Sequence, residues 1–282
     1  MVNITWDDLA FPFSYAARNP LYWLILPTSI AFMGAVAGAN PLPSSFIAAL
    51  LTLTYPAAFI VCAPNALYDR ETDAYNDRDY LRGKQLTEDD APAIWLWTTI
   101  FTVVCLLPPL IAWNVEALII GTAMITAALA YSVPPLRLKA HPEASLLLMS
   151  MGAWLLYAYG HAYTDTITNI PVRSFYYGLI THTAVSLGAL PDIEADKQAD
   201  DTTFPVKYGE TPTILLGIIT CVAALASGTI HGVIAAFIAA YAASMVSMLI
   251  FKHYVIHFKA VATVGFLTIC YYVWRGLSQT II

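Results

Sequence analysis

Long apolar runs, separated by short polar breaks, are the feature that most limits how this chain can fold. A helix that crosses a bilayer core of about 30 Å needs roughly 20 such residues, and lipid satisfies no backbone hydrogen bonds. The chain contains nine candidate spans, Pro20–Ala39, Ser44–Pro64, Ala91–Trp113, Val115–Ser132, Glu143–His161, Ser174–Pro191, Thr211–Ser227, His231–Ile250 and Phe258–Thr280. The sequence therefore predicts an all-α polytopic membrane bundle of nine transmembrane helices, forming a single domain over residues 1–282.

The composition supports this interpretation. Of the 282 residues, 59% are hydrophobic and 11% are charged, whereas a soluble domain is about 45–50% apolar and about 25% charged. Disorder is excluded as well, because it requires low hydrophobicity and high charge. The formal net charge is −6, so we expect no nucleic acid partner, since phosphate binding needs a cationic surface.

The distribution of Lys and Arg predicts the orientation in the membrane. Of the 13 basic residues, only Arg173 and Arg275 lie on one side of the nine spans, and the other eleven lie on the opposite side. Because basic loops face the cytoplasm, we expect the N-terminus and the long polar loops there. Of the 19 acidic residues, only Glu116 and Asp165 fall on the outer side.

Most of the cytoplasmic acids gather in two similar motifs. The first follows the second span and contains Asp69, Glu71, Asp73 and Asp77, and the second follows the sixth span and contains Asp192, Glu194, Asp196 and Asp200. Both read Asp-x-Glu-x-Asp-x-x-x-Asp. In a helix, residues four apart share one face. This spacing predicts one stripe of Asn65, Asp69, Asp73 and Asp77, and another of Asp192, Asp196 and Asp200.

Rows of carboxylates suit Mg²⁺, which typically takes one or two protein carboxylates and completes its shell with water and substrate phosphates. Two stripes that face each other would hold a diphosphate between them. The alternative is that both motifs are solvated acidic loops. The match between the two motifs, each at the end of a span on one membrane face, favours the metal interpretation.

A third polar element follows the fourth span. It runs from Tyr131 and Ser132 through two prolines to Arg137 and Lys139. The two cations are expected at the same surface as the acids, where they would bind diphosphate oxygens while the hydroxyl groups donate hydrogen bonds. The alternative function of these cations is to anchor the chain on its cytoplasmic side.

These elements together resemble the UbiA superfamily of intramembrane prenyltransferases, in span number and in all three motifs. The resemblance implies that Mg²⁺ and the diphosphate are bound by Asn65, Asp69, Asp73, Asp192 and Asp196, the four aspartates being the catalytic residues. It also implies that Tyr131, Ser132 and Lys139 contact the diphosphate, with Arg18, just before the first span, as a further contact.

The chain departs from the family pattern at two places. Ala66 replaces the Asp that usually follows the motif's Asn, and Arg82-Gly83-Lys84 stands where many quinone-pathway members have Lys-x-x-Arg-Pro. The segment Leu190–Asp196 is instead similar to the lycopene elongases of the carotenoid branch.

The resemblance thus implies transfer of a prenyl group from an allylic prenyl diphosphate to a lipid-soluble acceptor, with a carotenoid such as lycopene favoured. It also implies a location in the plasma membrane of a prokaryote. Two other enzyme functions stay open, namely prenylation of an aromatic quinone precursor or chlorophyll-type acceptor, and terpene cyclisation without an acceptor. A membrane transporter is disfavoured because the middles of the spans carry almost no charge.

Overall fold

The computed structural model describes residues 10–12, 22–38, 40–70, 86–230 and 232–251. These residues form helices and connecting turns, with no strand among them, which confirms the all-α prediction. The long helices are α2 (Tyr22–Val36), α3 (Ser44–Tyr68), α5 (Ala91–Ile111), α6 (Val115–Ser132), α7 (Pro142–His161), α8 (Arg173–Gly188), α11 (Glu210–Ala226) and α12 (Gly232–Phe251). The connecting segments include short helices α9 (Ile193–Gln198) and α10 (Phe204–Tyr208), and single 3₁₀ turns η1 (Glu88–Asp90), η2 (Leu138–Ala140), η3 (Ile167–Asn169) and η4 (Leu190–Asp192).

Eight of the nine predicted spans coincide with these long helices, and every boundary agrees within four residues. The ninth, Phe258–Thr280, lies outside the described residues. Among the residues that the structure describes, four helices are long and apolar enough to cross a membrane, namely Ser44–Tyr68, Glu88–Ile111, Val115–Ser132 and Ile234–Phe251. The chain is therefore an integral membrane protein.

Helix α6 shows how local sequence sets these boundaries. The side chain of Asn114 accepts a hydrogen bond from the Ala117 N–H at 3.0 Å, which caps the helix start. The Asn114 amide also donates to the Ala162 carbonyl at 2.8 Å, so the same residue ties α6 to the end of α7. Pro134 and Pro135 follow shortly after the last helical residue. Since proline cannot continue the backbone hydrogen-bond ladder, they end the helix here.

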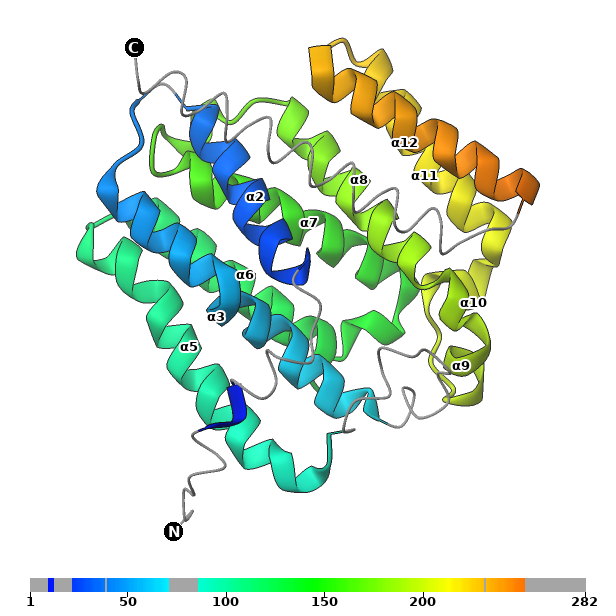
Figure 1. Cartoon of the computed structure of the whole chain (residues 1–282), viewed down its shortest axis with the longest axis horizontal. Coiled ribbons are helices and arrows are strands. Elements are labelled where there is room, and N and C mark those ends of the chain that lie inside the picture. The colour runs from blue at the N-terminus through cyan, green and yellow to red at the C-terminus, as the bar shows by residue number, and fades with distance from the viewer. Residues whose placement is uncertain (1–9, 13–21, 39, 71–85, 231, 252–282) are drawn as a thin grey trace.

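The helices pack as one bundle in which α2 lies against α7, α3 against α5 and α6, and α11 and α12 against each other beside α8 (Figure 1). The crossing of α2 and α7 is close, since the backbone of Ala31 lies directly over Gly160 and that of Tyr157 over Gly34. The C-terminal end of α3 lies at the same end of the bundle as α9 and α10 (Figure 1). The polar elements singled out in the sequence therefore converge at this end.

Candidate active site

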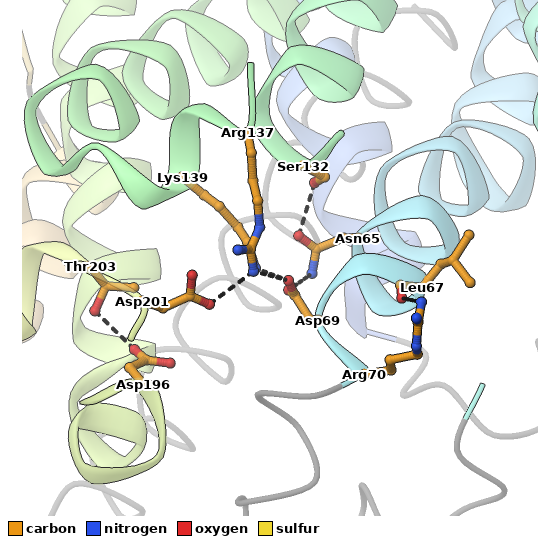
Figure 2. A network of polar contacts seen from close by, with 10 residues as sticks. All are labelled: Asn65, Leu67, Asp69, Arg70, Ser132, Arg137, Lys139, Asp196, Asp201 and Thr203. Carbon is orange, nitrogen blue, oxygen red and sulfur yellow. Dashed lines mark hydrogen bonds and ion pairs between the residues drawn. The ribbon is translucent and has the colours of Figure 1, made fainter. Parts of the chain in front are cut away.

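The first acidic motif begins at the C-terminal end of α3. Asp69 caps this helix and is 8% exposed. The amide of Asn65 donates to Asp69 Oδ2 at 2.7 Å, so the two side chains share a face as their spacing predicts. The Asn65 amide oxygen in turn accepts from the Ser132 hydroxyl at 2.9 Å. Three predicted site residues thus form one hydrogen-bonded chain (Figure 2).

Two cations from the segment after α6 neutralise Asp69. Lys139 Nζ contacts Asp69 Oδ1, and Arg137 Nη2 lies 3.3 Å from the same oxygen (Figure 2). A carboxylate at a helix C-terminus is disfavoured by the helix dipole, so these cations compensate an unfavourable position. The alternative function of Arg137 and Lys139 as simple membrane-side anchors does not account for this inward contact, because an anchor would extend toward lipid head groups.

Arg137 adopts a strained backbone conformation in making this contact. Its φ of 34° and ψ of 54° lie in the left-handed region, which costs most non-glycine residues on the order of 1 kcal/mol or more. The Arg137 N–H donates to the Val133 carbonyl at 3.0 Å, which closes the turn after α6. Such strain persists only where the surrounding structure fixes it, and it is frequent at functional sites.

The second acidic motif lies on the facing side, in η4 and α9. Asp196 is 8% exposed and accepts a hydrogen bond from the Thr203 hydroxyl at 2.9 Å. Asp192 is half-buried at the end of η4. The pKa of Asp196 is raised to about 6, chiefly by burial and less by the carboxylates of Asp192 and Asp201, whereas the Thr203 hydrogen bond and Lys139 oppose the shift.

The predicted stripe through Asp192, Asp196 and Asp200 is wrong at its last member. Helix α9 ends at Gln198, and Asp200 takes a left-handed φ of 58° and is exposed. The four-residue spacing places side chains on one face only while the helix continues. The next residue, Asp201, is 5% exposed and approaches the site instead.

Asp201 is the residue that sequence reasoning missed. Its Oδ2 lies 3.0 Å from Arg137 Nη2, so one guanidinium nitrogen joins Asp69 of the first motif to the turn that follows the second (Figure 2). The available signal was the polar run Asp200-Asp201-Thr202-Thr203 before Pro205, which is typical of a turn followed by a new helix.

The remaining predicted site residues are placed as follows. Tyr131 is half-buried in the last turn of α6, and its hydroxyl lies within electrostatic range of Asp69 and Asp196. Arg18 and Asp73 lie outside the described residues, as does Asp77.

The oxygen donors of this site fit Mg²⁺. Within the described ranges, no group of three or more His, Cys, Asp or Glu residues is close enough to hold a metal ion by itself. Mg²⁺ nevertheless uses few protein carboxylates, because substrate phosphates and water complete its shell. Burial disfavours the charged form of Asp196 and raises its pKa, and a divalent cation at this carboxylate would offset that cost.

Comparison with known proteins identifies the family and the fold. The UbiA prenyltransferase family matches residues 24–268. A UbiA homologue from Archaeoglobus fulgidus bound to GPP and Mg²⁺ has a TM-score of 0.65 and 20% identity, over 94% of this chain and 99% of that one. The same homologue bound to DMAPP and Mg²⁺ has a TM-score of 0.63 and 19% identity over the same shares.

A third solved structure, the apo form of a UbiA homologue from Aeropyrum pernix K1, has a TM-score of 0.73. Its sequence is 16% identical, over 94% of this chain and 100% of that one. At this identity the likeness shows the fold. No curated protein sequence matches the chain.

Proposed function

The chain belongs to the UbiA prenyltransferase family and is a prenyltransferase, and we propose that it transfers a prenyl group from an allylic prenyl diphosphate to a lipophilic acceptor with the aid of Mg²⁺. The observation that carries this proposal is the meeting of two acidic helix ends around a shared pair of cations. Asp69 and Asp196 come from different motifs, and Lys139 acts electrostatically on both.

The proposed metal ligands are Asn65, Asp69, Asp73, Asp192 and Asp196. The bound ion would neutralise the diphosphate and make it a better leaving group. The structures of the Archaeoglobus homologue with GPP or DMAPP and Mg²⁺ support both the donor class and the metal.

The chain's own cations would bind the diphosphate end of the donor. Of these two cations, Lys139 is the more enclosed, with a side chain 12% exposed against 29% for Arg137, so its charge is poorly screened by water and acts strongly on a nearby oxyanion. Arg137 adds planar donors that match phosphate geometry. The hydroxyls of Ser132 and Tyr131 are the neutral donors in this arrangement, and Arg18 completes the proposed set.

Departure of the diphosphate leaves an allylic cation that must be kept from water. Tyr157 and Tyr159, in the last two turns of α7, are almost fully buried, at 1% and 2% exposure. Aromatic faces stabilise cations by about 0.5–2 kcal/mol, most strongly when desolvated. An interior of this kind excludes water and favours attack by an electron-rich carbon of the acceptor, after which a proton is lost.

We propose a carotenoid such as lycopene as the acceptor. The support is the Leu190–Asp196 segment, together with the absence of the Lys-x-x-Arg-Pro stretch typical of quinone-pathway members. The attacking group would then be a terminal alkene, and the donor a C5 diphosphate. An aromatic or chlorophyll-type acceptor, or cyclisation of the donor alone, would give products of different mass.

The test is turnover by the purified full-length protein with Mg²⁺ and donors of several lengths, with lycopene, with an aromatic acceptor, or with neither. We expect a product whose mass equals lycopene plus one prenyl unit. Diphosphate release without any acceptor would identify a cyclase, and an aromatic product would overturn the carotenoid proposal.

Matched variants test the site within the same assay. Asp69→Asn and Asp196→Asn should abolish turnover, whereas Asp200→Asn, which removes an exposed charge from the same segment, should retain it. Excess chelator should stop diphosphate release. Normal turnover by Asp69→Asn, or full activity in chelator, would contradict the proposed metal site.

The site is also proposed to face the cytoplasm of a prokaryotic plasma membrane, on the basis of the Lys and Arg asymmetry. In inside-out vesicles, a membrane-impermeant amine reagent should label the exposed Lys197, and in right-side-out vesicles it should not. The opposite pattern would invert the topology.

A further inference from the structure

Asp201 is a buried acid outside the repeated spacing of both motifs. Its side chain is 5% exposed, and it contacts Arg137 at 3.0 Å (Figure 2). A buried carboxylate is costly unless a charged or hydrogen-bonding partner compensates it. The Arg137 guanidinium provides that partner, so the two residues form a pair across the site.

The backbone holds Asp201 in place independently of Arg137. The Asp201 N–H donates to the Asp196 carbonyl at 2.8 Å, which folds the chain back after α9. Helix α10, three residues further on, is fastened to α7 because Lys207 and Tyr208 both contact Glu143 Oε1. Asp201 therefore extends from a supported turn.

Arg137, in contrast, depends on its partners. Its side chain is 29% exposed, and a single nitrogen, Nη2, makes both acidic contacts, the one to Asp201 being shorter than the 3.3 Å contact to Asp69. Its buried Nε–H has no acceptor among the described residues. The guanidinium thus has donors to spare for a further anion.

Asp69 alone cannot fix this guanidinium. Lys139 contacts the same carboxylate oxygen, so Arg137 shares Asp69 with a more enclosed cation. Asp69 is also a proposed ligand of Mg²⁺, and a carboxylate engaged by a metal ion has less negative charge to offer Arg137. Asp201 is the carboxylate that Arg137 keeps in either case.

We propose that Asp201 is a positioning residue for diphosphate binding. It holds the Arg137 guanidinium at the junction of the two motifs, with its spare N–H groups available to phosphate oxygens. This inference rests on the proposed function, since it assumes that the site binds a diphosphate. The competing role, Asp201 as a direct ligand of the metal, would act without Arg137.

The experiment is a double-mutant cycle on the full-length protein in detergent micelles. Binding of inorganic pyrophosphate in the presence of Mg²⁺ is measured by calorimetry for wild type, Asp201→Asn, Arg137→Gln and the double variant. Asp200→Asn is the matched control, because it removes the same charge from the adjacent, exposed residue.

We expect Asp201→Asn to weaken pyrophosphate binding by about tenfold or more, the usual effect of losing a hydrogen bond between charged groups. Asp200→Asn should stay within about twofold of wild type. In the Arg137→Gln background, Asp201→Asn should have almost no further effect, because interacting residues are not additive.

Three results would overturn the inference. The first is that Asp201→Asn binds pyrophosphate as tightly as Asp200→Asn does. The second is that Asp201→Asn has an undiminished effect in the Arg137→Gln background, which would indicate a direct metal ligand. The third is that Arg137→Gln binds pyrophosphate as tightly as wild type. Because this variant leaves the backbone hydrogen bonds of Asp201 intact, the test does not depend on whether Asp201→Asn folds. If wild type binds no pyrophosphate with Mg²⁺, the proposed function fails and this inference with it.

Discussion

Gly160 lies where α7 crosses α2, and replacing it with alanine tests the packing of the whole bundle. A Cβ atom at this position would overlap the carbonyl oxygen of Ala31 and lie 2.6 Å from its carbonyl carbon. An ordinary contact is about 3.5 Å, and the oxygen would lie nearer than the carbon, so the two helices would have to separate locally by about 2 Å. Both obstructing atoms belong to the backbone, which cannot rotate away as a side chain can.

The expected cost combines overpacking with lost hydrogen bonds. Inserting a methyl group into a packed interior costs about 1–3 kcal/mol. Separation of the helices also strains the bond from the Thr164 hydroxyl to the Ala35 carbonyl, 2.8 Å long, worth about 0.5–1.5 kcal/mol. We therefore expect Gly160→Ala to destabilise the protein by about 3 kcal/mol, which lowers Tm by about 6–12 °C in a chain of this size.

Gly152 provides a matched control in the same helix. No atom of the described residues lies within 4 Å of a Cβ built there, its chain neighbours and own helix backbone aside. Gly152→Ala should leave Tm unchanged or raise it slightly, because alanine is favoured over glycine in helices by up to about 1 kcal/mol. Thermal unfolding of both variants in the same detergent is the measurement. Equal melting temperatures for the two variants would refute the close crossing of α2 and α7.

Two further predictions concern the second acidic motif. Asp200→Gly should raise the stability by up to about 1 kcal/mol, because glycine adopts the left-handed φ of 58° without strain, and a fall in Tm would contradict this geometry. The pKa of Asp196, raised to about 6, means that protons compete with Mg²⁺ near neutral pH. The half-saturating Mg²⁺ concentration should therefore rise as pH falls from 7 to 5. Thr203→Val removes a hydrogen bond that lowers the Asp196 pKa, so the half-saturating Mg²⁺ concentration should begin to rise at a higher pH. A calorimetric titration that gives the same pH dependence as wild type would contradict this role of Thr203.

The sequence predicts the helices of this protein well, because each boundary has a local cause. Apolar runs of the length that a membrane requires become helices, and Asn114 and the Pro134–Pro135 pair mark the two ends of α6. The Asn65–Asp69 pair is likewise predictable, since both residues lie within helical geometry, four residues apart. Periodicity is a reliable guide wherever the helix continues.

Beyond the helix ends, periodicity fails for a physical reason. The turn at Asp200 reverses the chain after α9. Asp201 therefore approaches the site in place of Asp200, and this depends on the left-handed backbone of Asp200. The contact between Arg137 and Asp201 joins residues 64 positions apart, from segments that no local pattern relates. Those contacts come from the packing of α7 against α10, which sequence spacing alone does not specify.

The charges at the site also explain why the acidic motifs can lie close together. Asp69, Asp196 and Asp201 are all nearly buried, and carboxylates this close repel one another in a medium of low polarity. Arg137 and Lys139 supply two positive charges to the same place, so the net excess among these five groups is a single negative charge. Binding of a diphosphate would increase that negative excess, because it adds more negative charge than the two cations can neutralise. A divalent cation is then required for the substrate to enter, which predicts that pyrophosphate and Mg²⁺ bind cooperatively and that pyrophosphate alone binds weakly.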